Sequence, residues 1–302
     1  MLDILLKAGC YIAIIILGMV LRAVGFFKEE DFPVLSKIVV KVTLPAAIIS
    51  SAAGRELDPS LLTLALLGFG GGVIYMITGY LICRSKGKNW QAFGLLNLPG
   101  YNIGTFALPF TQSFLGATGV LATSLFDVGN AFICLGGAYG VASAIKAGHG
   151  FDWKRVAKAL SRSAPFLVYV ITTSMNLCHI PIPGFIASTA SIIAGGNAFM
   201  AMLMIGVGFK LDLDRSQLGM IAKMIAARFS IAAVLALAFY FLLPFPLEVR
   251  QTLVILAFAP IGSAVPGFTE ELGEDVGLSC SINSVSILIS IVIIVTLLVV
   301  ML

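Results

Sequence analysis

The chain alternates long apolar runs with short connections that collect its charges, glycines and prolines. Ten apolar segments can be distinguished, and most approach the roughly 20 residues that a helix needs to cross a bilayer. They cover residues 4–21, 34–53, 60–83, 91–114, 118–145, 160–178, 185–209, 218–243, 251–270 and 277–301. The pattern predicts an all-α integral membrane protein with ten transmembrane helices, because an outer-membrane barrel would alternate apolar and polar residues instead.

The composition supports this class and excludes others. Of 302 residues, 59% are hydrophobic and 11% are charged, whereas soluble domains carry roughly 25% charged residues. The spans leave no room for a catalytic module, and H-E-x-x-H, G-x-S-x-G and phosphate-loop motifs are missing, so we expect neither an enzyme nor a cofactor. The five cysteines stand singly, without the spacing of metal ligands, so no metal site is expected.

Positive charges are distributed asymmetrically between the two sides. The connections 1–2, 3–4, 5–6 and 7–8 hold most of them, at Arg22, Lys28, Lys37, Lys41, Arg84, Lys86, Lys88, Lys146, Lys154, Arg155, Lys158, Arg162, Lys210, Arg215 and Lys223. Only Lys7, Arg55 and Arg250 belong to the other side. The positive-inside rule therefore predicts a multi-pass protein of the cell (inner) membrane with both termini extracytoplasmic. Because the net charge of +4 reports topology, no nucleic-acid partner is expected.

The first half of the sequence is echoed in the second. A shift of 157 residues superposes identical residues of segments four and nine: Ala107, Pro109, Leu115 and Gly116 on Ala264, Pro266, Leu272 and Gly273. A shift of 154 superposes the ends of segments two and seven: Gly54 and Asp58 on Gly208 and Asp212. Since each half has five spans, the halves enter the membrane in opposite directions, as in the inverted repeats of secondary transporters. We expect a first repeat over 1–145, a cytoplasmic linker over 146–159 and a second repeat over 160–302.

Segments four and nine are the most interrupted by glycine and proline. Residues 97–109 read N-L-P-G-Y-N-I-G-T-F-A-L-P, and residues 259–267 read A-P-I-G-S-A-V-P-G. Each proline removes a backbone hydrogen bond, so a continuous helix is costly here. Because freed backbone groups cannot face lipid, both breaks should line a cavity, where half-helix N-termini favour an anion and unwound carbonyls a cation.

Four stretches carry a family resemblance: V-T-L-P-A-A-I-I in segment two, L-P-G-Y-N-I-G-T-F-A-L-P-F in segment four, F-M-A-M-L-M-I-G-V-G-F in segment seven and A-P-I-G-S-A-V-P in segment nine. They resemble the auxin efflux carrier family, which comprises the plant auxin carriers and their bacterial relatives. The resemblance implies two inverted five-helix repeats with broken helices four and nine crossing at the midplane. It further implies a scaffold of helices 1, 2, 6 and 7, often a homodimer, and a bundle of helices 3–5 and 8–10 that moves against it in elevator-type alternating access. Family substrates are small organic anions.

The resemblance also implies site residues. Asn102 matches the family's crossover asparagine, Pro109 and Pro266 match its prolines, and Pro260 fits the earlier proline of segment nine. Asn97, Gly104 and Ser263 lie beside the breaks and complete the candidate substrate-binding set: Asn97, Asn102, Gly104, Pro109, Pro260, Ser263 and Pro266. This chain has one residue more between Gly262 and Pro266 than the plant pattern, and it lacks the long hydrophilic loop of many plant members.

Ionisable groups inside the spans are candidates for ion coupling. Asp127 and Asn130 share one helix face, and a carboxylate in a span either couples H+ or Na+ or is a buried structural group. Glu270 is either a cation-coupling group or part of a solvated turn. Arg228, about ten residues into segment eight, either binds an anion or extends to the cytoplasmic surface, and we prefer the second interpretation.

These inferences favour a secondary carrier that moves a small carboxylate, such as a dicarboxylate or auxin-like acid, across the lipid bilayer. A sodium-coupled symporter of the bile-acid-transporter type has the same expected architecture and is the alternative. A channel is less favoured because no selectivity ring or repeated pore motif is visible.

Overall fold

The computed structural model describes residues 2–55, 58–148, 150–210 and 215–302, and all regular elements within these ranges are helical. Seven helical stretches are long and apolar enough to cross a membrane: Ile4–Ala23, Phe32–Ala52, Pro59–Lys86, Ile103–Ala147, Gly184–Gly208, Leu218–Leu242 and Val276–Met301. The prediction of an all-α membrane protein is therefore confirmed. Asp212, which entered the repeat comparison, lies outside the described residues.

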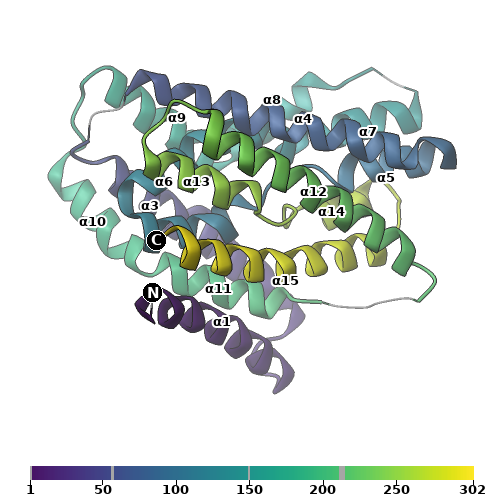
Figure 1. Cartoon of the computed structure of the whole chain (residues 1–302), viewed down its shortest axis with the longest axis horizontal. Helices are drawn as coiled ribbons and strands as arrows, with labels where there is room; N and C mark the ends of the chain where they lie inside the picture. The colour runs from purple at the N-terminus through teal and green to yellow at the C-terminus, as the bar shows by residue number, and fades with distance from the viewer. Residues whose placement is uncertain (1, 56–57, 149, 211–214) are drawn as a thin grey trace.

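The helices follow the predicted segments closely (Figure 1). The first half contains α1 (Leu2–Ala23), α2 (Phe32–Ile38), α3 (Leu44–Ala52), α4 (Thr63–Cys83), α5 (Lys88–Asn97), α6 (Leu108–Phe132) and α7 (Ala138–Ala147). The second half contains α8 (Trp153–Arg162), α9 (Ala164–Leu177), α10 (Gly184–Gly195), α11 (Asn197–Gly208), α12 (Leu218–Leu242), α13 (Leu247–Ala257), α14 (Val265–Glu271) and α15 (Val276–Met301). Short π-helical turns η2 (Val39–Thr43), η5 (Ile103–Ala107) and η6 (Ile133–Gly137) connect α2 to α3, lead into α6 and connect α6 to α7.

Segments four and nine are both broken, as predicted. Helix α5 ends at Asn97 and helical structure resumes with η5 at Ile103, while α13 ends at Ala257 and α14 begins at Val265. The two unwound stretches touch, because the backbone N–H of Asn102 donates a hydrogen bond to the carbonyl oxygen of Pro260 over 2.8 Å.

The prolines occupy two kinds of position. Pro99 and Pro260 lie within the unwound stretches, where they have no helical bond to interrupt. Pro109 and Pro266 lie instead in the first turns of α6 and α14. A proline fits at the start of α14 because a first-turn N–H has no intrahelical partner. The first pair therefore stops the helices and Pro266 begins α14, whereas Pro109 lies where the turn η5 passes into α6.

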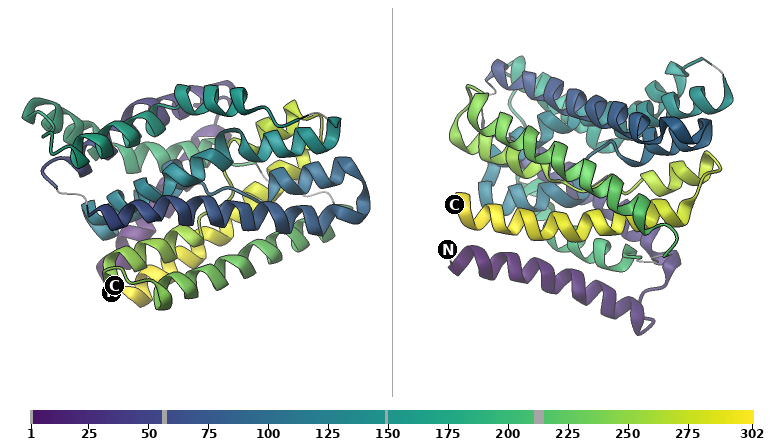
Figure 2. Two further views of the ribbon diagram at one scale, coloured as in Figure 1. Left: turned by 90° about the horizontal axis from the view of Figure 1, so that it is seen from above. Right: turned by 45° about the vertical axis from the view of Figure 1, so that its right-hand side comes forward.

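The helices pack in two groups. α1 packs along α11, and α3 packs along α9 and α10; α4 packs along α5 and α6, and α12 packs on α13 and α15. Figure 2 shows α1 at one edge of the molecule, with both chain termini at the same end. Segments four and five meet at Gly116, whose φ of +57° turns the chain inside α6 between the two predicted spans.

One helix of the chain was not predicted. The connection expected to be a linker over 146–159 contains most of α8, and the following span begins at Ala164, not at residue 160. The boundary was misplaced because α8 also contains apolar residues: Val156 and Leu160 pack on Ala131 of α6. Ser163 separates the two helices, and its hydroxyl accepts a hydrogen bond from the backbone N–H of Phe166 over 3.4 Å.

Candidate functional site

The two breaks cross at Asn102. Its backbone bonds to Pro260, and its side-chain oxygen accepts a short hydrogen bond from the hydroxyl of Thr105. The Asn102 side chain is buried and precedes η5, so it stands at the beginning of the second half of segment four. The predicted juxtaposition of Asn102 with the proline of segment nine is thus present in the structure.

Arg228 of α12 holds the crossing together. Its Nη1 donates to the carbonyl oxygen of Leu98 over 2.6 Å, and its Nη2 donates to those of Gly100 and Ala259 over 2.9 and 2.8 Å. Leu98 and Gly100 belong to the first break and Ala259 to the second. The cation that these unwound carbonyls bind is therefore a side chain of the protein.

The preferred interpretation of Arg228 as a residue that extends to the cytoplasmic surface is wrong. Its side chain is 1% exposed, and the guanidinium carbon lies 4.8 Å from the centre of the Tyr75 ring and 5.7 Å from that of Tyr101. Three carbonyls and two aromatic faces compensate the guanidinium for the water it has lost. The guanidinium of Arg228 is stable inside the protein because the helix breaks supply hydrogen-bond acceptors that an intact span lacks.

Gly100 shows how closely the first break is packed. Its φ of +81° is in the left-handed region, and a Cβ built there would lie 2.6 Å from the sulfur of Cys134. Gly104, a predicted site residue, lies in η5 so close to α3 that a Cβ would come within 2.5 Å of a Leu44 methyl carbon. Gly100 requires glycine because of its backbone conformation, whereas at Gly104 the Leu44 side chain would have to move, which explains part of the motif between the two prolines.

Asp127 and Asn130 of α6 reach the same crossing. The amide of Asn130 accepts from the backbone N–H of Tyr101 over 3.0 Å and donates to its carbonyl over 2.9 Å, so it replaces the helical partners that the break has removed. It also donates to Asp127 over 2.8 Å. The other carboxylate oxygen of Asp127 accepts from the hydroxyl of Tyr169 on α9 over 3.2 Å. Asp127 thereby connects the first break to a helix of the other packing group.

Asn97 joins helices away from the crossing. Its side chain is buried and bonds to the hydroxyls of Thr269 on α14 and Ser279 on α15, over 3.1 and 2.5 Å. It lines neither of the two cavities described below. Glu270 is exposed at the end of α14 and is also absent from both linings.

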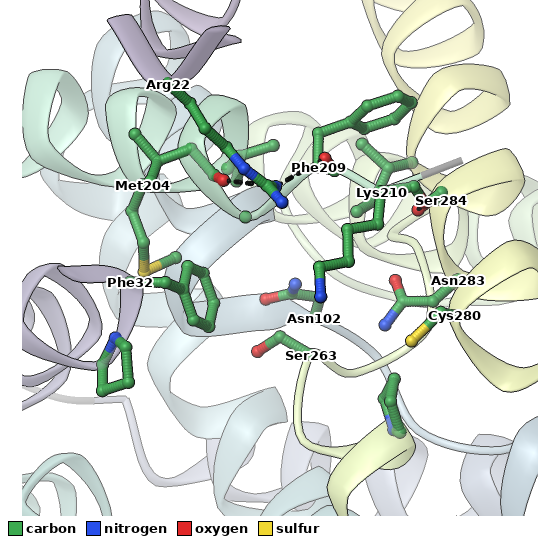
Figure 3. Close-up of a pocket in the computed structure, with 16 residues that line it drawn as sticks. Arg22, Phe32, Asn102, Met204, Phe209, Lys210, Ser263, Cys280, Asn283 and Ser284 are labelled. Carbon is green, nitrogen blue, oxygen red and sulfur yellow. Dashed lines mark hydrogen bonds between the residues drawn. The ribbon is translucent and has the colours of Figure 1, made fainter. Parts of the chain in front are cut away.

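A cavity of about 330 Å³ lies on one side of the crossing. Asn102, Ser263 and Pro266, all predicted site residues, line it together with Asn283 of α15. Arg22 and Lys210 are the charged residues of its described lining. Figure 3 shows the Lys210 side chain extending towards Asn102, with Ser263 and Asn283 beside it. Arg22 also fixes α1 to the end of α11, because it donates to the carbonyls of Val207 and Phe209 over 3.0 Å each.

A second cavity, of about 540 Å³, is also lined by Asn102 and Ser263. Asp127, Asn130, Gly104 and Lys37 are among its lining residues. The structure therefore brings six predicted residues to one cavity or the other: Asn102, Ser263, Pro266, Gly104, Asp127 and Asn130. The carbonyl of Pro260 accepts the hydrogen bond from Asn102 at the crossing, and the carbonyl of Pro109 accepts one from Tyr11 of α1.

Polar contacts join α6 to its neighbours α1 and α11 on the side of the crossing away from the first cavity. The hydroxyl of Tyr11 on α1 contacts the hydroxyl of Ser113 and donates to the carbonyl of Pro109 over 3.3 Å. Asn197 of α11 donates to the side-chain oxygen of Gln112 over 3.3 Å. Tyr11 precedes Arg22 by eleven residues, or about 16 Å along a helix at 1.5 Å per residue. The first cavity and these contacts thus lie at different depths.

Sequence reasoning missed the roles of Arg228, Arg22 and Lys210. Lys210 and Arg22 were interpreted only as topology signals, because basic residues beside a connection report orientation in most membrane proteins. Their positions could have indicated a role near the membrane, because Arg22 and Lys210 each follow a predicted span directly. For Arg228 the signal was its depth within a span, where an ionisable residue is a functional candidate by default.

Comparison with known proteins shows a similarity to membrane transporters. Residues 11–145 match the family model described as membrane transport protein. A protein of Methanothermobacter thermautotrophicus described as an uncharacterized transporter is 24% identical over 282 residues, covering 89% of this chain and 89% of that protein. The chain is thus similar to membrane transport proteins, and its membrane-spanning helices agree with that class. The resemblance to transporters of the auxin efflux carrier type, indicated by the motifs, is confirmed over its first half.

Proposed function

We propose that the protein is a secondary carrier of a small organic anion, which binds in the first cavity at the crossing. The observation that carries this proposal is the position of Arg22 and Lys210 beside Asn102 and Ser263 in one cavity. Two cationic side chains and neighbouring amide and hydroxyl groups suit a carboxylate, which accepts hydrogen bonds and carries negative charge. The volume of about 330 Å³ lies at the lower end of the range for small-molecule sites.

We further propose that the chain forms ten spans in two inverted repeats and works by elevator-type alternating access. The packing of α1 and α3 with α9, α10 and α11 supports a scaffold, and the packing of α4–α6, α12, α13 and α15 supports a bundle. Both cavities are bordered by residues of the basic connections, among them Arg22, Lys37 and Lys210. With those connections in the cytoplasm, these positions support a state that is open to the cytoplasm and closed at the Tyr11–Ser113 contact.

Removing the charge of Lys210 tests the binding role directly. In proteoliposomes, Lys210→Gln is expected to raise the KM for the transported anion about 10-fold or more, since a hydrogen bond to a charged partner contributes about 1.5–3 kcal/mol. The matched control is Lys28→Gln, which removes an exposed lysine outside both cavity linings. It should leave the KM within about twofold, as expected for a surface charge. Equal KM values for the two variants would exclude Lys210 from the site.

Ion coupling is proposed at Asp127. Its carboxylate lines the second cavity and bonds to Asn130 and Tyr169, so a proton or Na+ bound there would alter contacts on both sides of the crossing. Sodium coupling at this group would correspond to a symporter of the bile-acid-transporter type, and proton coupling to a sodium-independent carrier.

Asp127→Asn is expected to abolish the dependence of uptake on the coupling ion, because the amide can neither titrate nor supply a charge for Na+. Initial uptake rates measured from pH 5.5 to 8.5, with and without sodium, distinguish the two ions. Asp58→Asn changes an exposed acid in the same way and serves as the control. If Asp127→Asn keeps the wild-type pH profile and the wild-type sodium response, Asp127 is a structural group.

A further inference from the structure

Helix α8 presents a row of cations that the rest of the protein leaves uncovered. Lys154, Lys158 and Arg162 are exposed and follow one another at intervals of four residues, which places them along one side of the helix. The opposite side carries Val156 and Leu160, which pack on Ala131. The helix is therefore amphipathic with its apolar side already occupied by the protein.

The nearby acidic residues Glu271 and Glu274 pair with other basic residues. Arg155 pairs with Glu271 over 2.7 Å and stacks on Tyr139, with its guanidinium carbon 3.9 Å from the ring centre. Lys146 pairs with Glu274 over 2.5 Å. Among the described ion pairs, none involves Lys154, Lys158 or Arg162. Their charge is directed away from the protein.

The length of the next helix fixes the depth of α8. Helix α9 has 14 residues, or about 21 Å at 1.5 Å per residue, whereas the hydrocarbon core is roughly 30 Å thick. All of α9 therefore fits inside the membrane, and because a charge is costly in hydrocarbon, we expect the side chain of Arg162, two residues before the start of α9, to extend to the lipid headgroups. Trp153 at the other end of α8 is 71% exposed, and tryptophan is enriched at this level of membrane proteins.

We propose that the exposed side of α8, formed by Trp153, Lys154, Lys158 and Arg162, binds the headgroups of anionic phospholipids in the adjacent leaflet. The charge of the surface, its position beside the headgroups and the exposed indole all match this partner. Because α8 joins the two halves of the chain, lipid bound there holds the connection at the membrane surface. The proposal is independent of the transported substrate and of the direction of transport.

The two tryptophans of the chain allow a direct test. Trp90→Phe leaves Trp153 as the single reporter, and the variant is reconstituted in lipid nanodiscs that contain either brominated phosphatidylglycerol or brominated phosphatidylcholine at the same mole fraction. Bromine quenches indole fluorescence only at short range. We expect brominated phosphatidylglycerol to quench Trp153 at least about twofold more strongly, and salt near 1 M to reduce the difference because the Debye length falls to about 3 Å.

Two variants in the Trp90→Phe background separate the binding surface from general charge attraction. The triple change Lys154→Gln, Lys158→Gln and Arg162→Gln should abolish the preference for phosphatidylglycerol. Lys86→Gln with Lys88→Gln removes two exposed charges from the 3–4 connection and should leave the preference intact. The lysine and arginine substitutions are all at exposed positions, Trp90 is half-buried, and unchanged melting temperatures verify the fold. Equal quenching by the two lipids, or a preference that survives the triple change, would overturn the proposal.

Discussion

Arg228→Leu is expected to abolish transport and to lower the free energy of unfolding by about 3–5 kcal/mol, the cost of breaking a buried charged network. The leucine would leave the carbonyls of Leu98, Gly100 and Ala259 without the donor that now joins them. Each buried acceptor without a partner costs about 1–3 kcal/mol. Because these carbonyls belong to both breaks, the crossing should loosen and the cavity beside it should lose its shape.

The measurement combines thermal melting in detergent with uptake in proteoliposomes. Arg250→Leu is the matched control, because Arg250 also lies near an aromatic ring and donates to a single carbonyl, that of Tyr240, over 2.8 Å. It should cost about 1 kcal/mol, as for one net hydrogen bond. Arg228→Lys retains the charge without the planar fork, so we expect a stability between those of the wild type and Arg228→Leu. Wild-type melting and transport by Arg228→Leu would show that the crossing does not depend on this residue.

Asn102→Ala is expected to reduce transport about 10- to 100-fold while the protein remains folded and inserted, if its amide contributes the 1.5–3 kcal/mol of a hydrogen bond to a charged group. The backbone bond from Asn102 to Pro260 survives the substitution, so the breaks still meet. Asn102→Asp is a sharper test, because it keeps an acceptor for Thr105 and places a negative charge where the anion should bind.

Both variants are compared with Asn89→Ala, which removes an exposed amide of α5. The expected order of anion affinity is wild type and Asn89→Ala first, then Asn102→Ala, then Asn102→Asp. Uptake by Asn102→Asp at the wild-type rate would remove Asn102 from the anion site.

The broken helices could be predicted because the residues that break them lie close together within each segment. Two prolines and several glycines within a dozen apolar residues are incompatible with a continuous helix, and internal similarity pointed to the same two segments. The spacing of the prolines did not reveal that they occupy different structural positions. Pro99 and Pro260 stop helices, whereas Pro266 begins one and Pro109 lies where η5 passes into α6, and these roles differ only in the backbone around each residue.

The candidate site was harder to predict because its parts come from distant helices. Asn102 was found from its motif, and Asp127 and Asn130 from their depth in a span. Asn97 looks equivalent to Asn102 in sequence, yet it bonds to Thr269 and Ser279 outside both cavities. No local pattern distinguishes these two asparagines, because the difference depends on which helices pack against them.

Arg228 and α8 were misjudged for different physical reasons. A charge in or beside an apolar run is normally interpreted relative to lipid and water, and that interpretation ignores acceptors supplied by broken backbone elsewhere in the chain. Arg228 is stable in the interior because three unwound carbonyls surround it. Helix α8 was not predicted because it buries only two residues, Val156 and Leu160. It is too short for a span and too basic for a core helix.

The measurement that tests the central claim most directly is the melting temperature of the purified protein against mono- and dicarboxylates and indole acids, each with and without sodium. A ligand that binds the folded state raises its apparent stability. The account predicts that at least one small carboxylate raises the melting temperature and that this rise is smaller in Lys210→Gln. Stabilisation by cations or neutral solutes, with none by any anion in the panel, would contradict it.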